Sequence, residues 1–222
     1  MVSIMNNIIL SGGVNSLEKF TTDSSIIVKA PSILNAINLC KDINLDIKIN
    51  AGASLVINLF DYADNETVNI RIESYDNSSL TINSSFIAAG KYELNIDENL
   101  YGDNIKCDVF IRGINEAAGI VKIDMTGTVA GETKGSVLNE YARIINKSEN
   151  SSVLIPNLIV NTNEVIANHG VSIGGFRNDE LFYLASKGID EETSKKLIEE
   201  GFINSIFDSE TRDIVKNVLI GR

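Results

Sequence analysis

The sequence predicts an all-β chain that ends in a small helical region. Short runs in which apolar and polar residues alternate recur from Leu45 to about Val129, and similar runs continue to Ile173. Such alternation with a period of two, rich in β-branched side chains, is typical of strands. Clusters of Gly, Asn, Asp and Ser separate the runs. The run centres repeat roughly every 9 to 14 residues, which fits an all-β sandwich, a meander or a solenoid with two strands per coil.

The expected strands follow one another closely along the chain. They are residues 47–49, 55–59, 68–72, 80–82, 92–96, 105–111, 120–123, 137–145, 153–160 and 165–173. The turns between them lack the two-residue Asn-Gly or Asp-Gly sequences that mark antiparallel hairpins, which favours a mainly parallel solenoid over a meander. Residues 32–41 fit either a helix or an irregular strand, because their apolar residues could line a helix while the surrounding sequence is rich in strands.

The C-terminal part of the sequence predicts three short helices. Asn178 is the expected N-cap of the first, which has acidic residues in its first turn and ends at Gly188. Asp190 is the expected N-cap of the second, which should end at Gly201. The third should begin at residue 208 or 209. Its apolar stripe consists of Ile214, Val215, Val218 and Leu219.

These patterns divide the chain into a β core, residues 1–174, and a C-terminal helical domain, residues 175–222. Thirty acidic residues against 19 basic ones give a net charge of -11, which repels phosphate backbones and anionic lipids. We therefore expect neither nucleic acid nor a membrane as a partner. The chain shows no basic leader and no long apolar run, which predicts a soluble cytoplasmic protein. Cys40 and Cys107 are too few for a disulfide framework and too far apart for a thiolate metal site, so we expect buried, reduced thiols.

One C-terminal stretch carries a family resemblance. Residues 165–202 read VIANHGVSIGGFRNDELFYLASKGIDEETSKKLIEEGF. The stretch combines a His-Gly pair, a later glycine, an acidic residue before Leu-Phe-Tyr-Leu, then Lys-Gly-Ile and a helix that ends in Gly-Phe. It resembles the C-terminal signature of the SufB/SufD family, subunits of an iron-sulfur cluster assembly complex that works with the ABC-type ATPase SufC. The resemblance reaches weakly back to about Gly113.

The resemblance implies a right-handed parallel β-helix followed by a small helical domain that docks the ATPase. Because usual members are much longer and carry an N-terminal helical region, this chain is expected to be a short, SufD-like version with fewer coils. It implies a non-catalytic subunit rather than an enzyme. The implied partners are a SufC-like ATPase and either a second SufB/SufD-like subunit or another copy of the chain.

His169, the single histidine, lies where SufD-type members place the histidine thought to help hold iron or the nascent cluster at the subunit interface. A neutral imidazole can ligate iron. The alternative is a turn histidine that packs locally. Iron-sulfur scaffolds favour thiolates, and no Cys lies within about 60 residues of His169. This favours a supporting SufD-like role, or a cluster completed across a dimer. No firmly bound cofactor is expected, and at most a transient iron ion or cluster at the dimer interface.

The helical region contains more apolar residues than three short helices need to cover one another. We expect part of this set to remain exposed and to bind the ATPase. The residues concerned are Leu181, Phe182, Leu184, Ile189, Leu197 and Phe202.

Other candidates have simpler explanations. Cys107 shares one strand face with Ile105 and Val109, so it is expected in the apolar core, as is Cys40. Neither thiol can be aligned with the sulfur-receiving cysteine of the family. Asp61, Asp64 and Glu66 suggest the paired carboxylates of carbohydrate enzymes, but a turn between strands places Asp there as well. The alternative function is accordingly a stand-alone β-solenoid enzyme or a binding module acting on a polymer.

Overall fold

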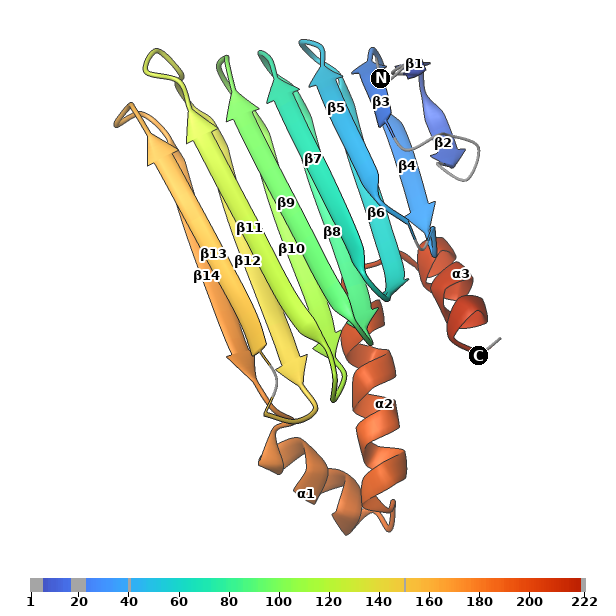
Figure 1. Cartoon of the computed structure of the whole chain (residues 1–222). Helices are drawn as coiled ribbons and strands as arrows, with labels where there is room; N and C mark the ends of the chain where they lie inside the picture. The colour runs from blue at the N-terminus through green and yellow to red at the C-terminus, as the bar shows by residue number, and fades with distance from the viewer. Residues whose placement is uncertain (1–5, 17–22, 40, 150, 221–222) are drawn as a thin grey trace.

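Fourteen strands and three helices make up the described residues, 6–16, 23–39, 41–149 and 151–220, of the computed structural model (Figure 1). The strands are β1 (Asn6–Leu10), β2 (Gly13–Ser16), β3 (Asp23–Val28), β4 (Ser32–Ile37), β5 (Ile43–Ile49), β6 (Ser54–Ala63), β7 (Glu66–Ser74), β8 (Ser79–Ala88), β9 (Lys91–Leu100), β10 (Lys106–Asn115), β11 (Ile120–Val129), β12 (Val137–Asn146), β13 (Ser151–Val160) and β14 (Ile166–Gly174). The helices are α1 (Asn178–Ser186), α2 (Glu191–Asn204) and α3 (Ser209–Ile220).

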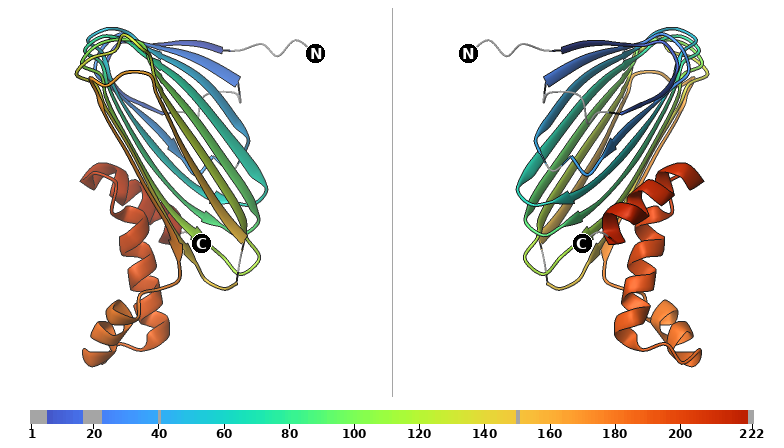
Figure 2. Two further views of the ribbon diagram at one scale, coloured as in Figure 1. Left: turned by 90° about the vertical axis from the view of Figure 1, so that its left-hand side faces the viewer. Right: turned by 90° about the vertical axis from the view of Figure 1, so that its right-hand side faces the viewer.

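The strands form a parallel solenoid with two strands per coil. Within the described residues, the odd-numbered strands form one seven-stranded sheet and the even-numbered strands form another, and both follow chain order. Neighbouring strands in each sheet pair in parallel throughout. The two sheets face each other as the walls of a flattened coil (Figure 2). The predicted parallel solenoid is confirmed, and the sandwich and the meander are excluded.

The coils begin earlier than the sequence pattern indicated. Residues 32–37, which fitted either a helix or a strand, form β4 and pair in parallel with β6. Leu34 and Ala36 point inward and are buried in the same core as the later coils. The strand period therefore wins over the helical period, because both neighbours offer paired backbone groups and an apolar interior.

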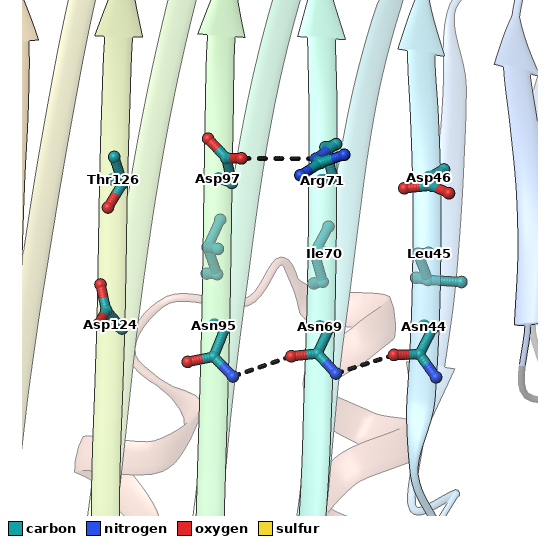
Figure 3. A pocket seen from close by; sticks show the side chains of 11 residues that line it. Asn44, Leu45, Asp46, Asn69, Ile70, Arg71, Asn95, Asp97, Asp124 and Thr126 are labelled. Carbon is teal, nitrogen blue, oxygen red and sulfur yellow. Dashed lines mark hydrogen bonds and ion pairs between the residues drawn. The ribbon is translucent and has the colours of Figure 1, made fainter.

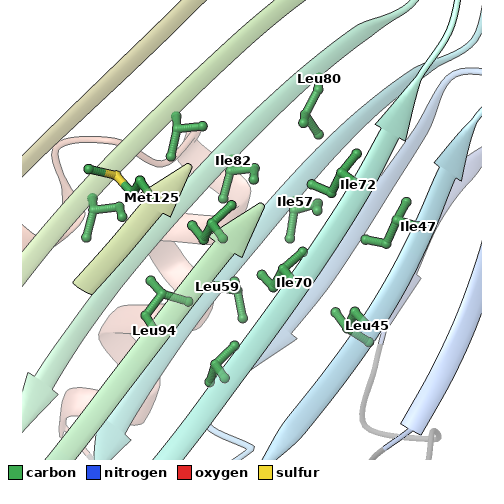
Figure 4. Close-up of a cluster of buried hydrophobic side chains, with 14 of the residues drawn as sticks. Leu45, Ile47, Ile57, Leu59, Ile70, Ile72, Leu80, Ile82, Leu94 and Met125 are labelled. Carbon is green, nitrogen blue, oxygen red and sulfur yellow. The ribbon is translucent and has the colours of Figure 1, made fainter. Parts of the chain in front are cut away.

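Apolar side chains from both sheets fill the interior (Figure 4). The parallel register stacks equivalent residues of successive coils on one another, as in the column formed by Leu45, Ile70, Ile96 and Met125. Each coil therefore covers the core of its neighbour, and the solenoid is stabilised coil by coil.

The helix boundaries match the predictions in most places. Asp190 caps α2, since its side chain accepts a hydrogen bond from the Thr193 backbone N–H at 2.9 Å. Gly188 has a positive φ of 81° after the end of α1. The predicted cap Asn178 is instead the first residue of α1, and Arg177, in extended backbone, takes the capping position. Gly201 does not end α2, because the helix continues to Asn204 to bury Ile203 against the sheet.

Helices α2 and α3 pack on the outer face of the even-numbered sheet. Ile37, Phe60, Ile87 and Ile114 project outward from four strands and join Ile203, Phe207 and Val215 of the helical region in a second buried cluster, the helix-anchoring cluster. At its edge the amide of Asn58 donates to Thr211 Oγ1 at 3.1 Å. The strands end at Gly174 and the helices begin at Asn178, close to the predicted division of the chain.

Helix α1 differs from the other two, because none of its residues is buried. It packs against α2 and lies away from the sheets (Figures 1 and 2). None of the helices in the described part of the chain combines the length and the apolar character that a bilayer span requires.

Candidate functional site

The last coil leaves an open apolar end. Strands β13 and β14 each pair on one side only within the described residues. Their inward side chains have no further coil above them, so Val160, Val171 and Ile173 are exposed while Leu154 and Leu158 are partly buried. An unpaired edge beside exposed apolar side chains is a surface suited to protein contact. We call this surface, formed by the inward residues of β13 and β14, the open end.

His169 lies within the open end. It occupies the strand position of β14 that pairs with Glu140 of β12, and it shares the inward-facing side of the strand with Ala167 and Val171. The imidazole is exposed, so it is not a buried structural histidine. In the described part of the chain, no group of three or more His, Cys, Asp or Glu side chains is placed to hold a metal ion. A metal bound at His169 would therefore need ligands from a second subunit or from the cluster itself.

Two glutamates inside the solenoid were missed by the sequence analysis. Glu98 of β9 and Glu140 of β12 are fully buried and point into the core from opposite sheets. Burial raises the pKa of Glu98 well above its usual range, and the nearby Glu140 raises it further. Burial likewise raises the pKa of Glu140 to about 7. Strand parity was the available signal, since each glutamate stands two positions from apolar residues on the same, inward face of its strand.

Of the two cysteines, the structure describes only Cys107. Cys107 is fully buried in the core, as expected. Burial raises the pKa of its thiol, and the carboxylates of Glu98 and Glu140 raise it further. Such a thiol is held in its unreactive, protonated form. Cys40 lies outside the described residues.

Asp61 and Glu66 form a second pair of buried acids. The turn interpretation holds for Asp64, which is exposed beside Asn65, but it is wrong for the other two residues. Asp61 belongs to β6 and Glu66 to β7, and both face the interior. Burial, followed by the charge of Asp61, raises the pKa of Glu66 to about 7. The pair does not converge in an open groove, as carbohydrate hydrolysis would require.

The outer face of the odd-numbered sheet carries a polar hollow of about 480 Å³ (Figure 3). Its floor is a ladder in which Asn95 donates to Asn69, and Asn69 to Asn44, each at 2.8 Å. Above the ladder, Arg71 Nε lies 3.5 Å from an Asp97 carboxylate oxygen. The lining contains no aromatic ring on which a sugar or base could stack, and its amides are occupied by one another. The hollow therefore does not favour the polymer-binding alternative.

The predicted partner-binding residues are spread over differing environments. Phe182 is 77% exposed and Leu197 is 48% exposed, whereas Leu181, Leu184 and Ile189 are half-buried. Phe202 instead packs toward the helix-anchoring cluster, with the guanidinium carbons of Arg112 and Arg143 5.7 Å and 5.4 Å from its ring centre. Tyr183, which the sequence analysis did not include, is 61% exposed beside Phe182.

Comparison with known proteins identifies the family of this chain. Residues 65–202 match the family model described as SUF system FeS cluster assembly, SufBD core domain. This chain belongs to the SufBD family. The matched segment runs from the start of β7 into α2, so it includes both the open end and helix α1 of this SufBD chain.

Three curated proteins of the same family are similar to parts of this chain. A SufBD family iron-sulfur cluster assembly protein of Mycobacterium leprae is 42% identical over 53 residues, which are 23% of this chain and 14% of that protein. One from Pyrococcus horikoshii is 30% identical over 99 residues, 41% of this chain and 22% of its own length. One from Mycobacterium tuberculosis is 33% identical over 89 residues, 39% of this chain and 20% of its own length. The matches thus span less than a quarter of each relative.

Proposed function

We propose that this SufBD chain is a non-catalytic, cytoplasmic subunit of a SUF-type iron-sulfur cluster assembly complex that acts with a SufC-like ABC ATPase. Membership of the SufBD family supports a role in cluster assembly. The observation that carries the finer proposal is that the matched segment combines an open apolar solenoid end with a separate, exposed aromatic helix. One surface suits a second solenoid and the other suits a different partner.

The open end is proposed to bind a second SufB/SufD-like subunit, or another copy of this chain. Pairing across the end would cover Val171 and Ile173 and would bring two His169 side chains toward one interface. Apolar burial provides the main driving force for such association. ATPase dimerisation, transmitted through the helical regions, would then change the spacing of the two solenoids and so the access to His169.

His169 is proposed to hold iron or the nascent cluster at this interface. Replacing it with alanine should change the free energy of unfolding by no more than about 0.5 kcal/mol, because the side chain is exposed. Iron and sulfide in the complex co-expressed with its ATPase should fall by about tenfold or more, because a methyl group cannot replace an imidazole ligand. Iron and sulfide analysis after size exclusion chromatography, with urea denaturation of the free subunit, measures both effects.

Asn168→Ala is the matched control. Asn168 is the preceding residue of β14, on the opposite face, and its amide donates to Asn139 Oδ1 at 3.0 Å. This variant should retain the iron content of the parent complex. A stability loss of about 1–3 kcal/mol in His169→Ala without an effect on iron would instead identify a structural histidine. Unchanged iron and unchanged stability would leave it a surface residue with no ligand role.

The ATPase is proposed to dock on α1. Phe182→Ser should weaken binding to the ATPase by about 2 kcal/mol, or roughly thirtyfold in Kd, because exposed aromatic residues at the centre of an interface contribute most of its binding energy. Biolayer interferometry with the purified ATPase provides the measurement. Ile120→Ser removes an exposed apolar side chain from β11 and is the control. Equal affinities for the two variants would place the dock elsewhere.

Substitution tests this dock more cleanly than truncation. Removing the residues after Gly175 would expose Ile37, Phe60 and Ile87, which α2 and α3 cover. A truncated chain could lose ATPase binding through unfolding alone. Phe182 avoids this problem, because its side chain already faces solvent.

A further inference from the structure

The buried acids Glu98 and Glu140 have no structural partner. Both side chains are fully buried, and none of their four carboxylate oxygens has a hydrogen-bond partner in another described residue. A buried carboxylate without such partners is costly, so one normally finds a donor, a proton or a metal ion beside it. The helix-capping acids Asp190 and Asp208, by contrast, are exposed and each accepts a hydrogen bond from a backbone N–H.

The two carboxyl groups converge across the interior. Gly127 of β11 is the direct register neighbour of Glu98 on β9. A Cβ atom built on Gly127 would lie 2.9 Å from Oε1 of Glu140, which projects from the opposite sheet. Glu140 therefore reaches across the core to the strand beside Glu98, and the glycine provides the space. The thiol of Cys107 lies in the field of both carboxylates.

The described residues supply no buried positive charge to the pair. The buried polar and charged residues of the described chain include no Lys, Arg or His. Two carboxylates in a medium of low dielectric cannot both ionise beside each other unless a cation joins them. The pair must therefore be neutralised by protons or by a bound cation.

We propose that Glu98 and Glu140 bind one divalent first-row metal ion inside the solenoid, below the open end, with Glu140 one coil and Glu98 two coils from it. Four carboxylate oxygens are suitable ligands for Mn²⁺ or Fe²⁺, and water can occupy the remaining positions. Glu140 is the register neighbour of His169 in the last coil, so an ion that entered from the open end would reach Glu140 first. This site does not depend on the proposed role of His169, which lies on the exposed surface above it.

Metal titration of the full-length chain tests the site. After dialysis against a chelator, Mn²⁺ is added and the free ion is counted by electron paramagnetic resonance; Fe²⁺ is then tested anaerobically in competition. We expect one site per chain. Glu98→Gln and Glu140→Gln should each weaken Mn²⁺ binding by about tenfold or more, because each replaces a charged ligand with a neutral amide of nearly the same shape. Glu132→Gln, in an exposed turn, is the control and should bind as the parent does.

Two further measurements keep the test independent of folding and of the proposed function. Mn²⁺ should raise the melting temperature of the unmodified chain, because a ligand that binds only the folded state stabilises it. His169→Ala should retain one Mn²⁺ site per chain even if it loses iron from the assembled complex. The proposal is overturned if the parent binds no Mn²⁺, or if both glutamine variants bind it with the parent's affinity. An infrared band of protonated carboxyl groups that persists at saturating Mn²⁺ and vanishes in the variants would also overturn it.

Discussion

Replacing Phe60 with alanine should lower the free energy of unfolding by about 3–5 kcal/mol, the usual cost of truncating a fully buried phenylalanine. Phe60 projects from the outer face of β6 and is completely buried in the helix-anchoring cluster. Its ring contributes to the surface on which α2 and α3 pack. The loss should therefore loosen the attachment of the helices while leaving the inner core of the solenoid, on the other face of the strand, intact.

Urea denaturation followed by circular dichroism measures the loss, and limited proteolysis locates it. We expect faster cleavage between residues 177 and 220 than in the strands. Phe182→Ala removes the same side chain from an exposed position and should change stability by no more than about 0.5 kcal/mol. If both variants lose equally little stability, the helices do not depend on this cluster for their attachment. The solenoid and the helical region would then be stabilised independently of each other.

The period of two predicted the strands because it reports the alternation of inward and outward side chains, which every coil repeats. The solenoid was favoured by the missing hairpin turns and by the family resemblance. The prediction began at Leu45 since the earlier strands are short and place small polar residues inside, as Ser24 of β3 shows. Local preference predicts a helix end at Gly201. The burial of Ile203, a tertiary effect, carries α2 past it.

The buried acids were missed for a related reason. An acidic residue within a strand is ordinarily expected to face solvent, and Glu98 stands beside Asp97, which does. Counting every second residue from Leu94 and Ile96 places Glu98 inside, although charged residues are rarely fully buried. His169 could be singled out through the family resemblance. The convergence of Glu98 with Glu140 could not, because it depends on two strands of facing sheets.

The stability of the parent chain should fall as pH rises, and Glu66 should be one cause. Burial and the charge of Asp61 raise its folded-state pKa to about 7, from 4.5 for an unperturbed side chain. The folded state therefore holds a proton that the unfolded state releases above about pH 4.5. The stabilisation is complete below that pH and is lost as pH rises through 7. The shift corresponds to about 3 kcal/mol over this window.

Glu66→Gln should remove this dependence, because the amide stays neutral at every pH. Urea denaturation of parent and variant from pH 4 to pH 8.5 gives two curves, and their difference isolates Glu66, since Glu98 and Glu140 are present in both proteins. The variant should gain relative to the parent as pH rises, reaching its largest advantage above pH 7. Glu132→Gln should reproduce the slope of the parent. A difference that is constant with pH, or that shrinks above pH 5, would show that Glu66 is ionised in the folded chain.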